Sequence, residues 1–296
     1  AETSGASGER GGGIVRFTDD VGAEIELEAP RRRIIALYSA HTENLFWIGA
    51  GGALIGGHKT CVRPPEAARF AVYDYMGDPE YIIAAEPDLV LTVPRIHRNV
   101  PGYIAELQKA GIPVVSLYCA GFDDFGEYIG RLALLTGVDA AAHLAEFYSG
   151  LERVRTKTAA IPSEKKRRIF FEATENNFRT AAPDSFPAFA IELAGLTNIA
   201  AGVPPLTAGS SIAPFGIERL MEKAAEIDLY AAQHGSMNPA TAESIRKRPG
   251  FSAIQAVAEG RVLVIDEQLI SSPVPGFLEG VRALARFAYP EMDWNE

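Results

Sequence analysis

Side chains able to hold a ligand follow the ends of several predicted strands. Aromatic rings can stack on a flat ligand, imidazoles can bind metal or hydrogen-bond, and guanidinium groups suit anionic oxygens. Because ligands of open α/β sheets bind outside the carboxyl ends of the strands, these side chains are candidate ligand-binding residues. In chain order they are Tyr38, Ser39, His41, Tyr73, Tyr75, Arg95, His97, Tyr118, Phe178, Ser211 and Ile212, with Phe122, Ser210, His234 and Met237 as further members.

Several of these residues also have a purely structural interpretation. Tyr75 can be an ordinary half-buried loop tyrosine, Phe178 a core aromatic after its strand, and His41 a structural histidine. Arg95 and Arg98 can belong to a solvated loop. Aromatic side chains outnumber charged ones among the candidates. This composition favours a bulky, partly apolar ligand over a small hydrated ion.

Motifs of several enzyme classes are absent from the sequence. It has no GxSxG, no GxxxxGK[ST] and no GxGxxG. The glycines at 49–52 end a predicted helix rather than begin one, so they do not form a phosphate loop. The acidic pairs Asp19–Asp20 and Asp123–Asp124 are interpreted as turn and cap residues. No paired acid and base stand out, and we therefore expect no enzyme.

Composition narrows the class of protein. The 296 residues are 47% apolar and 22% charged, as in packed globular proteins, and the net charge of -10 argues against a nucleic-acid surface. No apolar run is long enough for a membrane helix, and no signal peptide is recognised. The Gly- and Ser-rich residues 1–13 are interpreted as a flexible tether or a trimmed terminus. Cys61 and Cys119 either pair or are two small buried side chains.

Strands and short helices alternate in both halves of the chain. A hairpin is predicted at 14–27, before the first strand. Short apolar runs predict buried parallel strands at 34–38, 88–93, 113–118, 168–173, 227–232 and 261–265. Helices are predicted at 79–85, 104–110, 186–193, 217–224 and 275–288, and a long helical stretch with a break near Gly137 at 124–161.

This order predicts an α/β protein of two Rossmann-like lobes, each with a parallel sheet, joined by one long backbone α-helix. The expected boundaries are a flexible tail at 1–13, an N-terminal lobe at 14–123, a linking helical segment at 124–161 and a C-terminal lobe at 162–296. The two halves also echo each other. Each contains a short helix with a glutamate near its first turn, which leads into an aspartate that opens a strand, in DPEYIIAAEPDLVL and GIERLMEKAAEIDLY.

From about residue 14 to 290 the chain resembles the class III solute-binding proteins of ABC importers, the TroA-like group that serves siderophores, haem and cobalamin. The resemblance rests on the opening hairpin, strand and helix, on the two echoing segments, and on LQKAGIPVVSL, RIFFEA with FPAFAIELAGLTNIA, and RPGFSAIQAVAEGRVLVID in the family's order. It implies a rigid two-lobed binder that takes its ligand in the cleft between the lobes.

The resemblance also assigns roles to particular residues. Tyr75 lies five residues before Glu80, where cobalamin binders of this group place a tryptophan and some haem binders a metal-ligating tyrosine. Phe178 matches an aromatic that packs on cobalamin. His58, His97 and His234 lack the arrangement of the group's zinc and manganese binders, so no bare-metal site is expected.

Glu80 and Glu218 are expected to dock the membrane permease, because the group uses one glutamate on each lobe for this contact. A glutamate in a first helical turn is also favoured by the helix dipole, and that explains the position equally well.

The predicted function is therefore an extracytoplasmic binding component of an ABC importer. It captures a ferric siderophore, haem or a corrinoid, so the chelated metal, iron or cobalt, is cargo and no prosthetic group is expected. Its partners are the permease with its ATPase, and it meets the membrane only through the permease or a lipid anchor. The expected location is the periplasm or the cell surface, as a lipoprotein. The alternative is an enzyme or metallocluster protein on a related two-lobed fold.

Overall fold

The computed structural model describes residues 13–205, 207 and 209–294. Its packing divides the chain into two compact units. The first unit holds the chain up to Tyr118 together with Gly126–His143, and the second holds Cys119–Phe125 together with the chain from Leu144 onward. The predicted flexible tail at 1–13 lies outside the described residues except for Gly13, which begins the first strand.

A five-stranded parallel sheet forms the centre of the first unit. Its order is β5-β4-β3-β6-β7, and each neighbouring pair is parallel. Its three central strands are buried runs of small and branched apolar residues, the composition expected of a sheet covered on both faces. The strands are β3 (Ile34–Ala36), β4 (Leu54–Gly57), β5 (Ala71–Val72), β6 (Leu89–Thr92) and β7 (Val114–Ser116).

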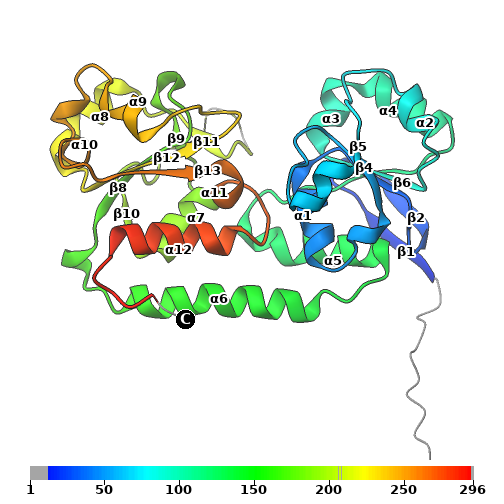
Figure 1. The fold of residues 1–296 in the computed structure, drawn as a ribbon, viewed down its shortest axis with the longest axis horizontal. Coiled ribbons are helices and arrows are strands. Elements are labelled where there is room, and N and C mark those ends of the chain that lie inside the picture. Colours follow the sequence, from blue (N-terminus) through cyan, green and yellow to red (C-terminus); the bar gives the residue numbers. More distant parts are fainter. Residues whose placement is uncertain (1–12, 206, 208, 295–296) are drawn as a thin grey trace, which may run out of the picture. The chain divides into compact units, whose positions relative to one another are not determined.

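Helices cover both faces of this sheet (Figure 1). On one face Ile82, Ile96 and Leu107 pack with the strand residues Ile35 and Val90 in one apolar cluster. The helices of that face are α2 (Glu80–Ile83), α3 (Pro94–Asn99) and α4 (Pro101–Lys109), and on the other face lie α1 (Ser39–Trp47) and α5 (Phe125–Thr136).

A β-hairpin at the start of the described chain is fastened to this unit by its turn. The antiparallel strands are β1 (Gly13–Thr18) and β2 (Glu24–Ala29). The buried carboxylate of Asp19 accepts hydrogen bonds from the backbone N–H groups of Val21, Ala23 and Ser116 at 2.9–3.0 Å. Asp20 accepts two bonds from the guanidinium of Arg131, at 2.8 and 3.1 Å. These acids are turn residues, as predicted.

The second unit is built around a four-stranded parallel sheet in the order β10-β8-β12-β13. A separate pair, β9 with β11, is antiparallel. The strands are β8 (Arg168–Glu172), β9 (Thr180–Ala181), β10 (Thr197–Asn198), β11 (Ile212–Ala213), β12 (Leu229–His234) and β13 (Val262–Asp266).

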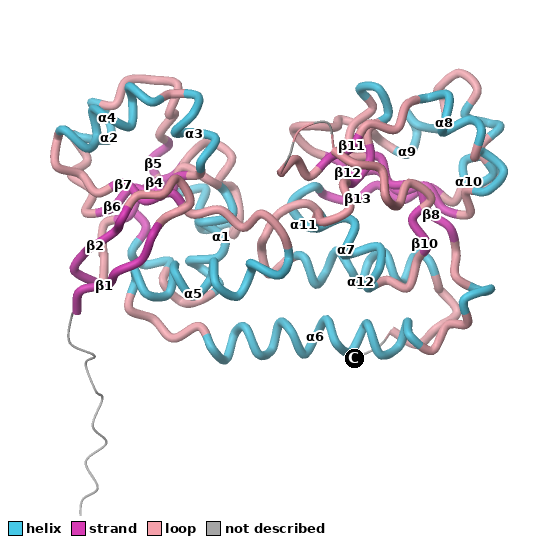
Figure 2. The backbone as a smooth tube through the Cα atoms, turned by 180° about the vertical axis from the view of Figure 1, so that it is seen from behind, coloured by secondary structure: helices cyan, strands magenta, loops and turns pink. Residues whose placement is uncertain are grey.

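Helices also cover both faces of the second sheet. Figure 1 shows α8, α9 and α10 on one face and α7 and α12 on the other, and Figure 2 shows the same layers from behind. The long helix α6 lies beside α12, where Gly150 faces Leu278 with no room for a β-carbon. The helices are α6 (Ala141–Ala159), α7 (Phe186–Leu193), α8 (Ile217–Glu222), α9 (Ala242–Arg246), α10 (Gln255–Ala258), α11 (Glu267–Ile270) and α12 (Phe277–Ala288).

The predicted α/β class, with a parallel sheet in each of two lobes, is confirmed. The unit boundaries differ from the predicted ones, because the predicted linking segment 124–161 is divided between the units. Helix α5 packs with the first unit and most of α6 with the second. Within the described ranges, no helix combines the length and apolar character needed to cross a membrane.

Candidate ligand-binding residues in each lobe

The predicted binding residues of the first lobe follow the carboxyl ends of its parallel strands. Tyr38 and Ser39 come after β3, Tyr73 and Tyr75 after β5, Arg95 and His97 after β6, and Tyr118 after β7. Because these strands run in the same direction, their carboxyl ends meet at one edge of the sheet, which is where ligands of open α/β sheets bind. Apart from His41, every predicted residue of this lobe is at least partly exposed.

Tyr73 and Tyr75 make contacts with the end of β4 and the residue after it at this edge. The backbone N–H of Tyr73 donates to the carbonyl of Gly57 at 2.9 Å, which continues the pairing of β5 with β4. The Tyr73 ring lies where a β-carbon on Gly56 would stand, only 2.3 Å from its Cε2. The ring of Tyr75 stacks on His58, with centroids 4.9 Å apart and planes inclined by 26°.

His58, to which the sequence assigned no ligand-binding role, lies beside Tyr75 and joins the candidate site. Its Nδ1 is 2.9 Å from the Thr60 hydroxyl and its Nε2 is 3.9 Å from a carboxylate oxygen of Asp74. Burial lowers the pKa of His58; Asp74 raises it in part, while the charges of Lys59 and Arg95 lower it again. The imidazole beside Tyr75 is therefore neutral at pH 7.

His41 does not belong to the candidate site, so its prediction as a ligand-binding residue is wrong. Its side chain is fully buried. Nε2 is 2.9 Å from the carbonyl of Thr92, which can only accept, so Nε2 carries the proton and Nδ1 accepts from the hydroxyl of Tyr128 at 2.8 Å. Burial lowers the pKa of His41 to about 4, although Thr92 and Asp20 act in the opposite direction. No nitrogen remains for a ligand.

The other polar candidates of this lobe are reachable from solvent. His97 is half-buried, and its Nε2 lies 2.7 Å from the hydroxyl of Thr92. Arg95 is exposed on α3. The backbone N–H of Tyr118 donates to Asp20 at 2.6 Å, and the residue as a whole is 37% exposed.

In the second lobe the structure brings three predicted residues onto neighbouring segments. Phe178 lies in the loop between β8 and β9, and β9 pairs with β11, where Ile212 faces Ala181 in the antiparallel register. The backbone N–H of Ala182 donates to the carbonyl of Ser211 at 2.9 Å. Phe178 is half-buried against Phe251, whereas Ser211 is exposed.

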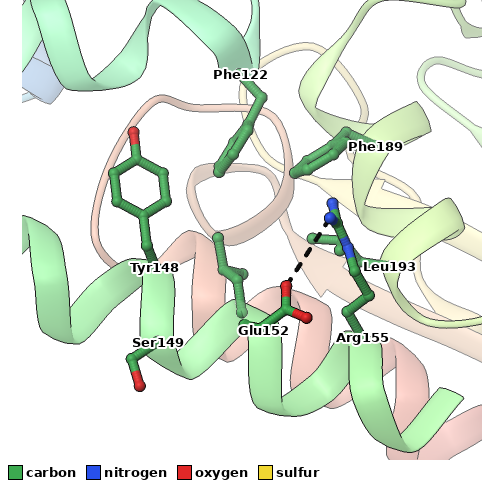
Figure 3. Close-up of a pocket in the computed structure, with 8 residues that line it drawn as sticks. Phe122, Tyr148, Ser149, Glu152, Arg155, Phe189 and Leu193 are labelled. Atoms are coloured by element: carbon green, nitrogen blue, oxygen red, sulfur yellow. Dashed lines mark ion pairs between the residues drawn. The ribbon is translucent and has the colours of Figure 1, made fainter. Parts of the chain in front are cut away.

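A cavity of about 440 Å³ opens within the second unit between α6 and α7 (Figure 3). Its walls are largely aromatic and aliphatic, and an ion pair of 3.8 Å between Glu152 and Arg155 spans its rim. The ring of Phe122 stacks on Phe189 with centroids 4.1 Å apart. Phe122 is partly exposed and forms part of the wall of this cavity. The lining residues are Phe122, Tyr148, Ser149, Leu151, Glu152, Arg155, Phe189 and Leu193.

Both predicted docking glutamates are exposed in the first turn of a short helix, as the sequence indicated. Glu80 is the first residue of α2, and its backbone N–H donates to Asp78 at 3.0 Å. Glu218 is the second residue of α8, which begins after Gly216 at a φ of 88°. Their contact with a permease remains a prediction.

The remaining metal-binding and thiol groups are dispersed. Cys61 and Cys119 are both buried, which agrees with their interpretation as small core side chains. In the part of the chain that the structure describes, no three histidine, cysteine, aspartate or glutamate side chains gather closely enough to hold a metal ion.

The comparisons with known proteins agree with this architecture. The sequence pattern of the periplasmic binding protein family matches residues 34–269. An uncharacterized ABC transporter substrate-binding lipoprotein of Bacillus subtilis, YvrC, is 24% identical over 282 residues, covering 94% of this chain and 86% of its own length. A cobalamin-binding protein of Halobacterium salinarum is 24% identical over 269 residues, with coverages of 88% and 70%.

Among solved structures, the periplasmic heme-binding protein RhuT of Roseiflexus sp. RS-1 has a similar fold. The TM-score is 0.70 at 18% identity, over 88% of this chain and 98% of that one. The family match, together with a parallel sheet in each of two units, defines the class of protein as a two-lobed solute binder. The chain belongs to the periplasmic binding protein family, as the sequence predicted for a substrate-binding protein of an ABC importer.

Proposed function

We propose that this protein captures a metal chelate outside the cytoplasm and delivers it to the permease of an ABC importer. The ligand is a corrinoid, haem or a ferric siderophore, and its metal is cargo. The ABC transporter substrate-binding lipoprotein of Bacillus subtilis supports the transporter partner, and the cobalamin-binding protein of Halobacterium salinarum supports the ligand class. The lipoprotein relative and the periplasmic binding protein family also support a location in the periplasm or on the cell surface, with attachment through a lipid anchor.

The observation that carries this proposal is the set of aromatic rings at the carboxyl edge of each sheet. In the first lobe Tyr75 is held by its stack on His58, and in the second Phe178 stands on the loop after β8. Ring faces held in this way suit a flat macrocycle or the apolar shell of a chelate. Arg95 and Ser211 are exposed polar anchors for carboxylates or other oxygens of the ligand.

Binding requires no chemical step by the protein. The phenol of Tyr75 either stacks on the face of a macrocycle or, when deprotonated, ligates ferric iron. Selectivity then depends on the shape of the ring surfaces and on a few polar contacts. We assign Glu80 and Glu218 to the permease rather than to the ligand. Each is exposed on a short helix, and neither is among the aromatic residues to which ligand binding is assigned.

A melting-temperature screen tests the ligand class. Cyanocobalamin, haemin and a ferric hydroxamate are added separately, with metal-free protoporphyrin, the iron-free hydroxamate and ferric citrate as controls. A chelate at 100 times its Kd stabilises the native state by about 2.7 kcal/mol, so we expect one chelate to raise Tm clearly. Failure of all three chelates to raise Tm would contradict the proposed ligand class.

A further inference from the structure

The loop that carries Phe178 has an unusual backbone. Asn177 has a φ of 56° and Phe178 a φ of 45°, so two consecutive residues other than glycine are left-handed. This conformation is disfavoured for side chains with a β-carbon, most of all for a bulky one such as phenylalanine. It persists only where surrounding contacts impose it, and such residues cluster at ligand-binding and active sites.

Arg248, just beyond α9, makes the contacts that can impose this shape. Its guanidinium donates to both carboxylate oxygens of Glu172, at 2.5 and 3.1 Å. It also donates to the carboxylate of Glu175 at 2.9 Å, inside the loop itself. One planar cation therefore joins the end of β8 to the beginning of the loop.

The same guanidinium lies over two aromatic rings. Its central carbon is 5.7 Å from the ring centroid of Phe178 and 5.3 Å from that of Phe251, and the two rings are 5.5 Å apart. Both distances are within the range of cation–π attraction. Arg248 thus contacts the loop at two points, the carboxylate of Glu175 and the face of Phe178.

The anchor of this arrangement is rigid because Glu172 is fully buried. The hydroxyl of Tyr230 donates to it, and Asn238 Nδ2 donates at 2.9 Å. Burial, together with the charge of Glu172, raises the pKa of Tyr230 well above its ordinary value, so this hydroxyl keeps its proton. Asn238 Oδ1 in turn accepts from the backbone N–H of Glu175 at 3.1 Å, a second tie to the loop.

We propose that Arg248 is a positioning residue that fixes the 174–179 loop, and with it the ring of Phe178, in the shape that meets the ligand before the ligand arrives. Such preorganisation removes an ordering cost from binding. This inference has two halves. The loop half, that Arg248 fixes the loop, concerns the ligand-free protein alone. The ligand half, that the fixed loop meets the ligand, rests on the proposed function.

Arg248→Lys is the informative substitution, because lysine keeps the charge opposite Glu172 but loses the planar, bidentate fork. Arg246→Lys is the matched control, since Arg246 is exposed at the end of α9, two residues before Arg248. Glu175→Gln is a milder second variant, because Glu175 is 49% exposed and its loss leaves the buried pair intact.

Amide hydrogen exchange in the ligand-free protein tests the loop half. The amides of Phe178 and Arg179 bond to the carbonyls of Glu175 and Thr174, at 3.2 and 3.1 Å. In Arg248→Lys we expect both to exchange about tenfold faster or more, with a smaller effect in Glu175→Gln and none in Arg246→Lys. Unchanged exchange, or equal acceleration throughout β8 and β12, would overturn the proposal.

A double-mutant cycle tests the ligand half with cyanocobalamin, haemin or a ferric hydroxamate, whichever binds. We expect Arg248→Lys to weaken binding about tenfold in the native background and less than about twofold when Phe178 is already alanine. Equal losses in both backgrounds would show that Arg248 does not act through Phe178. If none of the three chelates binds, the proposed ligand class fails, while the exchange measurement still decides the loop half.

Discussion

The imidazole of His58 lies against the phenol ring of Tyr75, with ring centroids 4.9 Å apart and planes inclined by 26°. His58 follows β4 and Tyr75 follows β5, so the pairing of these two strands creates the contact. Because His58 is neutral at pH 7, its imidazole adds no positive charge to the stack, which orients the Tyr75 ring.

Replacing Tyr75 tests its contact with the chelate. Tyr75→Ala should weaken binding about tenfold or more, because one ring face is lost. Tyr75→Phe separates two roles. It should preserve affinity if the ring only stacks and reduce it strongly if the phenolate ligates ferric iron. Titration of the visible absorbance of the chelate measures both.

Tyr81→Ala is the control for this pair, because Tyr81 is 73% exposed on α2 in the same unit. If Tyr75→Ala binds the chelate with native affinity, Tyr75 is not part of the binding surface.

The buried His41 predicts how stability depends on pH. Its pKa is about 6.5 in the unfolded chain and about 4 in the folded protein, so between these values the unfolded state binds more protons. The contribution of His41 to the free energy of unfolding is therefore complete above about pH 6.5. As the pH falls toward 4, the free energy of unfolding decreases by about 3 kcal/mol. Urea unfolding at several pH values measures this.

His41→Gln isolates this contribution, since an amide can still donate to Thr92 and accept from Tyr128 without titrating. Burial also lowers the pKa of His58 and His97, so part of the pH dependence should remain in the variant. The free energy of unfolding at pH 7.5 gives the reference for each protein. Identical pH profiles for native protein and variant would contradict the assignment.

The glutamates on the two short helices predict a separation of binding from delivery. Glu80→Ala combined with Glu218→Ala should abolish chelate uptake into cells or proteoliposomes that contain the permease, while Kd for the chelate stays native. Both side chains are exposed and lie on helix first turns, so their loss should not disturb the fold.

Glu106→Ala with Glu222→Ala makes the same change in net charge at exposed helix positions and should transport normally. If the Glu80 and Glu218 pair lowers affinity instead of uptake, these residues are not permease contacts.

Gly56 predicts a steric effect on the first lobe. A β-carbon there would stand 2.3 Å from Cε2 of the Tyr73 ring and 3.0 Å from the carbonyl oxygen of Ala71. Gly56→Ala should therefore displace Tyr73 and destabilise the protein by about 1–3 kcal/mol. Gly52→Ala is the control, because nothing lies within 4 Å of its added carbon. Equal denaturation midpoints for the two variants would contradict this reading of Tyr73.

The elements that were predicted best from the sequence are those whose ends are marked by neighbouring residues. Helix α7 spans Phe186–Leu193 as predicted, because Ser185 caps its start and Gly195 follows its end. Strand β4 was missed, because Leu54–Gly57 ends in two glycines that carry no strand preference. The need for glycine at these two positions follows from their neighbours in the fold. The Tyr73 ring and the Cys61 side chain lie so close that a β-carbon would contact them.

The candidate site was predicted less completely, because long-range contacts decide it. His41 stands after a strand in the sequence, but α1 turns it inward to Tyr128, which is 87 residues away. His58 has no motif of its own and gains its place from the pairing of β4 with β5. Arg248 looks like one of several surface cations until the fold brings it to Glu172, 76 residues away.

Direct titration of the purified protein tests the central claim, that this chain binds a metal chelate. Cyanocobalamin, haemin and a ferric hydroxamate are each titrated, and bound chelate is followed by its absorbance after separation from free chelate. We expect one of them to saturate at one chelate per chain with a Kd of about 1 μM or tighter, and its metal-free counterpart to bind more weakly. Absence of saturable binding for all three would contradict the account.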